Sequence, residues 1–78
     1  MARWVVKCGD NTVRTDNLYW TVRRLLDEHS RDDIEIWEEE FRLWRYKVVH
    51  IDGRRLVIKN ELLNKYVVVY PSGVHEYL

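Results

Sequence analysis

The stretch RYKVVHIDGRRLVIK, residues 45–59, decides the fold because its side chains alternate in character on both sides of a central Asp-Gly pair. Alternation indicates two strands, and Asp-Gly between them is a strong hairpin signal. We expect a three-residue loop with Gly53 in a left-handed conformation that forms a bulge. This register pairs His50 with Arg54, Val48 with Leu56 and Tyr46 with Ile58. It separates apolar from charged side chains, whereas a slip by one residue would bury the charged ones.

The second face of this hairpin is basic, since it carries Arg45, Lys47, Val49, Arg55, Val57 and Lys59. A row of positive side chains could follow the phosphate groups of a nucleic acid. The alternative nucleic-acid site of this chain is therefore Arg42, Arg45, Lys47, Arg55 and Lys59. A sequence pI near 6.8 disfavours that alternative, because nucleic-acid-binding domains are usually strongly basic.

The chain before this hairpin predicts two short strands and one helix. Residues 2–8 are rich in strand formers and place Trp4, Val6 and Cys8 on one face. Gly9-Asp10-Asn11 has turn chemistry, and residues 12–14 can return as a second strand. A helix is expected over about residues 16–30, with Thr15 or Asp16 as its N-cap.

The apolar spacing of this helix follows the helical period through Leu18, Val22, Leu25, Leu26 and His29. The exposed side is expected to carry the ion pairs Arg23–Asp27 and Arg24–Glu28, each four residues apart. His29 then lies in the last turn, where a packed histidine stabilises the helix terminus.

After Ser30 the period changes to two, which predicts a strand from Ile34 onward. Residues 60–64 fit either a wide turn or one helical turn. The run Val67-Val68-Val69 predicts a strand over 65–70 that is buried on both faces, followed by a turn at 71–73 and a last strand over 74–78. The expected fold is α+β, a single domain over 1–78 with one helix packed on a curled, mainly antiparallel sheet in the order ββαββββ.

The composition excludes several classes of protein. The chain has 13 basic and 13 acidic residues, ten aromatic residues and one cysteine in 78 positions. These numbers exclude a disordered chain, a disulfide framework and a cysteine-rich zinc site. Without an apolar segment long enough to span a bilayer or a signal region, we expect a cytoplasmic protein and no membrane partner. The excess of arginine over lysine, nine against four, favours a heat-adapted source. The small size would also suit a viral protein.

Groups capable of catalysis are few. Cys8 and His29 both fall on apolar faces, so packing is their expected role. His50 and Asp52 could begin a metal site together with His75-Glu76, but Asp before Gly is chiefly a turn signal. Glu38-Glu39-Glu40 alternate on a strand and do not converge locally. We therefore expect no enzyme activity, no catalytic or metal-ligating residues and no cofactor.

Charge is segregated along the chain, because residues 27–40 hold eight acids and one base whereas residues 42–59 hold six bases and one acid. Trp37, Phe41 and Leu43 lie around the boundary between these strips. Either a bulge near Leu43-Trp44 rotates the strand or these three side chains form an apolar patch, unless the helix packs over them. An exposed patch of this kind is typical of a protein-binding surface.

The sequence thus favours a small non-enzymatic domain that acts through protein contacts or by forming a homodimer. The expected protein-binding residues are Trp37, Phe41, Leu43, Glu38 and Glu40. Opposite charge strips on one chain suit self-pairing, in which the acids of each copy meet the bases of the other. A nucleic-acid-binding domain is the alternative, and a small enzyme ranks third because 78 residues scarcely enclose a pocket.

Overall fold

The first hairpin of the computed structural model, which describes residues 3–78, joins β1 (Trp4–Cys8) to β2 (Asn11–Thr15). Gly9 begins the turn between them with a φ of 61°, which glycine adopts without steric cost. A helix, a single 3-10 turn and five strands complete the described chain. These are α1 (Leu18–Leu25), η1 (Arg31–Asp33), β3 (Ile34–Glu38), β4 (Phe41–Ile51), β5 (Leu56–Asn60), β6 (Lys65–Val69) and β7 (His75–Tyr77).

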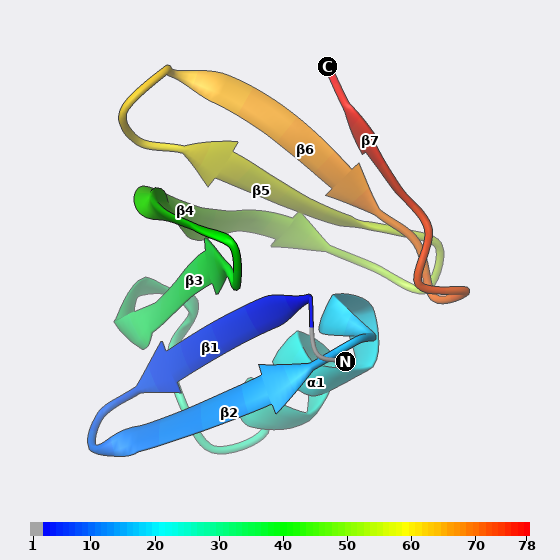
Figure 1. Ribbon diagram of the computed structural model, residues 1–78. Coiled ribbons are helices and arrows are strands. Elements are labelled where there is room, and N and C mark those ends of the chain that lie inside the picture. The colour runs from blue at the N-terminus through cyan, green and yellow to red at the C-terminus, as the bar shows by residue number, and fades with distance from the viewer. Residues whose placement is uncertain (1–2) are drawn as a thin grey trace.

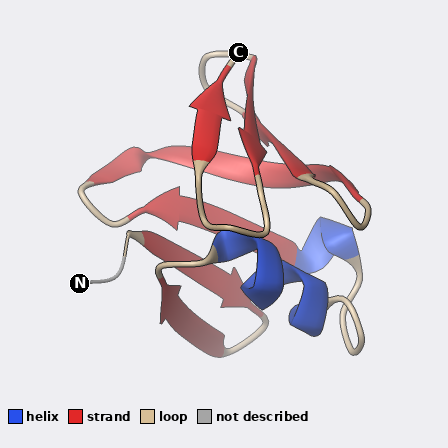
Figure 2. Ribbon diagram, turned by 90° about the vertical axis from the view of Figure 1, so that its right-hand side faces the viewer, coloured by secondary structure: helices blue, strands red, loops and turns tan. Residues whose placement is uncertain are grey.

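All these strands lie in one sheet with the order β2-β1-β3-β4-β5-β6-β7, and each neighbouring pair is antiparallel. The connection through α1 carries the chain from the edge strand β2 past β1 to β3. Figure 1 shows the sheet bending from the β1–β2 hairpin to β7, and in Figure 2 the helix lies against one side of it. The fold is therefore α+β, with one helix on an open antiparallel sheet. It has five strands after the helix rather than the expected four.

The core lies between α1 and one face of the sheet, which we call the inner face; the opposite one is the outer face. Strands β1 and β3 to β6 contribute alternate side chains to this core, and α1 adds Leu18, Tyr19 and Val22. The predicted inward face of β1 is confirmed, because Trp4, Val6 and Cys8 are at most 1% exposed. The prediction that β6 is buried on both faces is also confirmed, since all three of its valines are buried. The helix covers the inner face only.

The helix is shorter than expected, since it spans Leu18–Leu25 rather than residues 16–30. Asn17, and neither Thr15 nor Asp16, is its N-cap, and the Asn17 side chain accepts a hydrogen bond from the Trp20 backbone N–H. After Leu25 the backbone tightens into turns, in which Asp27 N–H donates to the Arg24 carbonyl at 3.1 Å. Both Leu25 and Leu26 pack on the core, which holds this turn in place.

This early end of α1 changes the setting of the residues after it. Asp27 and Glu28 lie in a turn rather than on a helical face, so the predicted pairs Arg23–Asp27 and Arg24–Glu28 do not form within the described residues. His29 is half-buried beyond the helix and does not occupy a last helical turn. The side-chain spacing was right for the first two turns, but it does not by itself fix where a helix stops.

The acidic triplet Glu38-Glu39-Glu40 is not a continuous strand. Glu38 ends β3 and pairs with Phe41 of β4, so that Glu39 and Glu40 form the turn between the two strands. The Glu39 carboxylate is 3.4 Å from Arg14 and 3.3 Å from Arg42, which relieves the repulsion between adjacent acids. This turn accounts for the additional strand in the element order.

The β4–β5 hairpin keeps the predicted faces over residues 45–48 and 56–59 but has a different register. His50, expected on the apolar face, lies opposite Val57 instead, and Ile51 packs against the core. Val48 pairs with Ile58 and Tyr46 with Asn60, so the expected pairs are wrong by two residues. The pairing shifts between Val48 and His50, where a bulge inserts Val49. The loop then runs over residues 52–55, and its Asp52 N–H donates to the Arg55 carbonyl at 3.0 Å.

Asp52, and not a left-handed Gly53, organises this loop. Its carboxylate accepts hydrogen bonds from the backbone N–H groups of Arg54 at 2.8 Å and Arg55 at 3.1 Å. Such a side-chain to backbone turn does not need a positive φ at the glycine, and Gly53 does not have one. The expected glycine bulge is therefore wrong because the aspartate supplies the turn instead.

The segment between β5 and β6, for which the sequence left two options, is a tight turn at residues 61–64. The buried Asn60 side chain accepts hydrogen bonds from the N–H groups of Leu62 and Leu63, at 2.9 and 3.0 Å. Asn64 closes the turn with a φ of 59°, a conformation that asparagine tolerates better than most residues. This turn holds Leu62 and Leu63 in solvent-exposed positions.

Glycine-to-alanine substitutions test this assignment of the turns. Gly53→Ala should change the free energy of unfolding by less than about 1 kcal/mol, because its φ is ordinary and the new Cβ meets nothing within 4 Å. Gly9→Ala should destabilise by roughly 1–2 kcal/mol, because alanine is strained in the left-handed region. Urea unfolding of both variants is the measurement. A larger loss of stability for Gly53→Ala than for Gly9→Ala would contradict the Asp52 turn and favour a hairpin with a left-handed Gly53.

Candidate protein-binding surface

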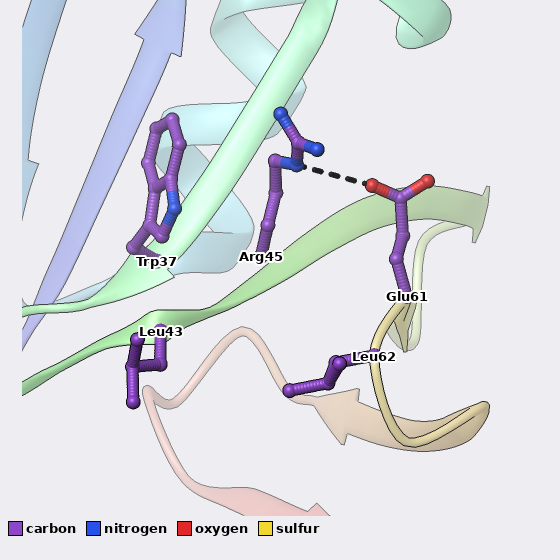
Figure 3. Close-up of a pocket in the computed structure, with 5 residues that line it drawn as sticks. All are labelled: Trp37, Leu43, Arg45, Glu61 and Leu62. Atoms are coloured by element: carbon purple, nitrogen blue, oxygen red, sulfur yellow. Dashed lines mark ion pairs between the residues drawn. The ribbon is translucent and has the colours of Figure 1, made fainter.

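A groove of about 350 Å³ opens on the outer face, away from the helix. Trp37 of β3 and Leu43 of β4 form one side, and Leu62 from the β5–β6 turn faces them across the opening, as Figure 3 shows. Leu43 is 81% exposed and Leu62 is 67% exposed, whereas Trp37 is half-buried. We call Trp37, Leu43 and Leu62 the apolar groove. The helix does not cover it.

An ion-pair network borders the apolar groove. The Arg45 guanidinium contacts Glu35 of β3 at 2.8 Å and Glu61 of the β5–β6 turn at 3.2 Å, and the second contact is drawn in Figure 3. Arg45 also lies directly opposite Trp37 in the β3–β4 pairing. The network links three segments that are distant in sequence and fixes the side chains at the rim. Each exposed pair adds little stability by itself, so its main effect is on the shape of the groove.

A bulge places Leu43 beside Trp37. Glu38 pairs with Phe41 but Trp37 pairs with Arg45, so Arg42, Leu43 and Trp44 are extra residues on β4. The first of the two sequence hypotheses, a bulge that rotates the strand, therefore describes the structure. Trp37 and Leu43 still share the outer side, because both line the same groove.

The other predicted protein-binding residues lie elsewhere. Phe41 is 44% exposed and stacks on Trp44 with ring centroids 4.3 Å apart, and Trp44 packs against the core. The Glu38 carboxylate accepts a hydrogen bond from the Tyr77 hydroxyl, and Glu40 lies exposed in the β3–β4 turn. The structure therefore brings Trp37 and Leu43 together and leaves the other three outside the groove.

Two residues of the groove were missed by the sequence reasoning, Glu61 and Leu62. Both belong to the turn segment Asn60-Glu61-Leu62-Leu63-Asn64. Two adjacent leucines between asparagines were the available signal, because a tight turn on the surface has no core-facing position for both. Their place opposite Trp37 depends on the strand register, which the sequence pattern did not determine.

Four residues of the predicted basic row have contacts within the chain, and two of them, Arg42 and Arg45, form ion pairs with glutamates. Arg42 contacts Glu39, Arg45 contacts two glutamates, and Lys47 donates to the Asp32 carbonyl at 2.9 Å. The Lys59 ammonium lies 5.9 Å from the Tyr66 ring centroid, in a cation–π contact. Arg55 lies in the β4–β5 loop, beyond the strand segment that carries the others. The outer face is therefore a mixed-charge surface and not a positive one.

The titratable groups whose pKa values are shifted lie among packed side chains rather than in an open reactive site. Burial, with the Asp33 charge second, raises the pKa of the Cys8 thiol, and a buried thiol without thiolate character is a poor nucleophile. Burial and then the Arg3 charge lower the pKa of His75, which contacts Arg3 at 3.2 Å. Burial, followed by Glu38, raises the pKa of Tyr46 to about 12, so this phenol stays protonated. None of these groups combines an exposed nucleophile with a base.

The candidate metal pair forms, but no further ligands join it. The His50 imidazole is 3.1 Å from the Asp52 carboxylate, whereas His75 packs edge to face on Trp4. Within residues 3–78 no group of three or more histidine, cysteine or acidic side chains is placed to hold a metal ion. Over the same residues, no helix is long and apolar enough to cross a membrane.

Acid unfolding of an Asp52→Asn variant tests the role of this carboxylate. Hydrogen bonds from the Arg54 N–H first, and then from His50 and the Arg55 N–H, lower the pKa of Asp52 to about 2. A lowered pKa means that the ionised group stabilises the fold above its unfolded pKa of roughly 3.9, and that this contribution disappears as pH falls through about 2. The urea midpoint of the wild type should therefore fall more between pH 4 and pH 2 than that of Asp52→Asn.

The control for this titration is Asp10→Asn in the β1–β2 turn, whose urea midpoint should follow the wild type. Identical acid responses of the wild type and Asp52→Asn would show that the loop does not depend on the charged form of Asp52.

In comparisons with known proteins, no family model, curated protein or solved structure matches this chain.

Proposed function

We propose that this chain is a non-enzymatic protein-interaction module that self-associates through the outer face of its sheet. The observation that carries the proposal is the apolar groove. Leu43 and Leu62 expose most of their side chains around the half-buried Trp37 indole, in a chain that packs most of its aliphatic residues. Apolar side chains around a concavity at a sheet face are typical of binding hot spots.

Charge on the outer face favours a second copy of the chain as the partner. Acidic Glu35 pairs with basic Lys47 across the strands, and Lys47 pairs with Lys59. Glu61 lies at the same face, where it contacts Arg45. When two copies meet around a two-fold axis, a surface with adjacent rows of both signs can place acids against bases twice. The formal net charge of zero adds no long-range repulsion between copies.

The size of the face also fits a dimer. The molecule measures 28 × 26 × 26 Å, so one face offers roughly 700 Å², close to the ~800 Å² per partner of a standard interface. A leucine from each copy could then enter the groove of the other. Nucleic-acid binding by this face is disfavoured, because Arg42 and Arg45 form ion pairs with glutamates and the carboxylates of Glu35 and Glu61 would repel phosphate groups.

Analytical ultracentrifugation of wild type and Leu43→Ser tests this function. At micromolar concentration the wild type should sediment with a mass near twice 9.6 kDa. Leu43→Ser should weaken association about tenfold or more, since a hot-spot truncation removes about 2 kcal/mol. Trp37→Ala should weaken it further. Leu43 is almost fully exposed, so its replacement should leave the circular dichroism spectrum unchanged.

Val74→Ser is the matched control, because Val74 is 59% exposed in the β6–β7 connection, outside the groove. It should sediment as the wild type does. A wild type that remains at 9.6 kDa across the concentration range would refute self-association, and equal weakening by Val74→Ser and Leu43→Ser would refute the groove as its site.

A further inference from the structure

The nine arginines of the chain divide into three groups by their contacts. Four of them form ion pairs with carboxylates, namely Arg14, Arg31, Arg42 and Arg45. Arg3 contacts the His75 ring. The remaining four are exposed and make no ion pair with any residue in the described range 3–78. These are Arg23 and Arg24 of α1 and Arg54 and Arg55 of the β4–β5 loop.

Tyr19 joins the helix to that loop and so brings the four arginines to one end of the molecule. The Tyr19 hydroxyl donates a hydrogen bond to the Asp52 carbonyl. The Arg23 guanidinium in turn donates to the Tyr19 hydroxyl at 3.3 Å. Arg54 and Arg55 follow Asp52 within three residues, and their backbones are fixed by the Asp52 carboxylate. We call Arg23, Arg24, Arg54 and Arg55 the arginine end.

An exposed aromatic ring stands beside the arginine end. Trp20 is 55% exposed, although the other three tryptophans are buried or half-buried. Its ring meets the buried Tyr19 ring edge to face, with centroids 5.0 Å apart. It is also one helical turn before Arg24, on the same side of α1. The helix thus presents a supported indole next to guanidinium groups.

Nearby acids offset only part of the charge of these four arginines. Asp52 is the one acid of the β4–β5 loop, and its oxygens already receive two backbone N–H groups and the His50 ring. Asp27 and Glu28 lie past the end of α1 and form no ion pair with Arg23 or Arg24 in the described chain. The arginine end therefore keeps an excess of positive charge, unlike the outer face of the sheet.

We propose that the arginine end and Trp20 form a binding surface for single-stranded nucleic acid. Guanidinium groups contact phosphates, and an exposed indole provides a face on which a base stacks. An acidic protein would use the same arginines, but it would gain no stacking from Trp20. A double strand keeps its bases stacked inside the helix, where one surface ring on a short α-helix does not reach them. The surface is separate from the apolar groove, so the two functions can succeed or fail independently.

Fluorescence anisotropy with a labelled 12-nucleotide oligothymidylate or oligouridylate tests this proposal. If four phosphates are contacted, the logarithm of affinity should fall with the logarithm of salt concentration at a slope of about −2.8. That slope corresponds to a loss of roughly fifty-fold between 50 and 200 mM salt. Binding should also quench tryptophan fluorescence, and the quenching should be reduced in Trp20→Ala.

Charge variants identify the surface. The double variant Arg54→Glu, Arg55→Glu should lose at least tenfold in affinity and reduce the slope to about −1.4. The matched control is Arg14→Glu, Arg31→Glu, which makes the same change in net charge at exposed arginines that already have acidic partners. It should bind within about threefold of the wild type. Trp20→Ala should lose about fivefold or more, and Trp20→Phe should recover part of that loss.

Three results would overturn the proposal. The first is no binding of either oligonucleotide at 50 mM salt. The second is an equal loss in the two double variants, which would reduce the effect to net charge. The third is that polyglutamate, at the same concentration of negative charge, competes as strongly as unlabelled oligonucleotide and that Trp20→Ala leaves binding unchanged. That combination would indicate an acidic protein as the partner.

Discussion

The bulge at Arg42-Leu43-Trp44 determines which side chains of β4 face the core. If the pairing of Glu38 with Phe41 continued along β4 without extra residues, Ile34 would lie opposite Arg45 and the guanidinium would point into the core. Three additional residues reverse the alternation, so that Tyr46 meets Ile36 instead. Burying an arginine without a partner costs several kcal/mol, and the bulge avoids that cost. The core, the Arg45 network and the apolar groove all depend on this one irregularity.

Hydrophobic alternation could predict the faces of the β4–β5 hairpin but not its register. A shift by one residue would exchange the faces, so the pattern excludes it. A shift by two leaves Tyr46 and Val48 on their own face, and the predicted and observed pairings of Tyr46, with Ile58 and Asn60, differ by that amount. The face changes only past the bulge, where His50 lies opposite Val57. What selects the observed register is the Asp52 turn together with the bulge at Val49. Both are local hydrogen-bonding choices that a period of two does not encode.

For the candidate site, too, the sequence could predict which face a side chain lies on but not which strands and turns meet there. Alternation along residues 34–37 could place Trp37 on the outer face, and the structure keeps it there with Leu43 beside it. The opposite side of the groove comes from the β5–β6 turn, whose position follows from the strand register. The ion pairs could not be predicted either, because sequence spacing indicates only pairs within one element, and the expected pairs lay in a helix that ends early. The observed Arg45 pairs join strands and a turn that are remote in sequence.

A net charge of zero describes neither of the two surfaces. The β5–β6 turn at the groove and the β4–β5 loop at the arginine end lie at opposite ends of β5, whose five residues extend over roughly 17 Å. That separation is about twice the screening length of ~8 Å at physiological salt, so a ligand at one end experiences chiefly the charges of that end. The near-neutral pI therefore does not argue against a local anion-binding surface. What matters is which arginines the fold has left without acidic partners, and the tertiary structure determines that.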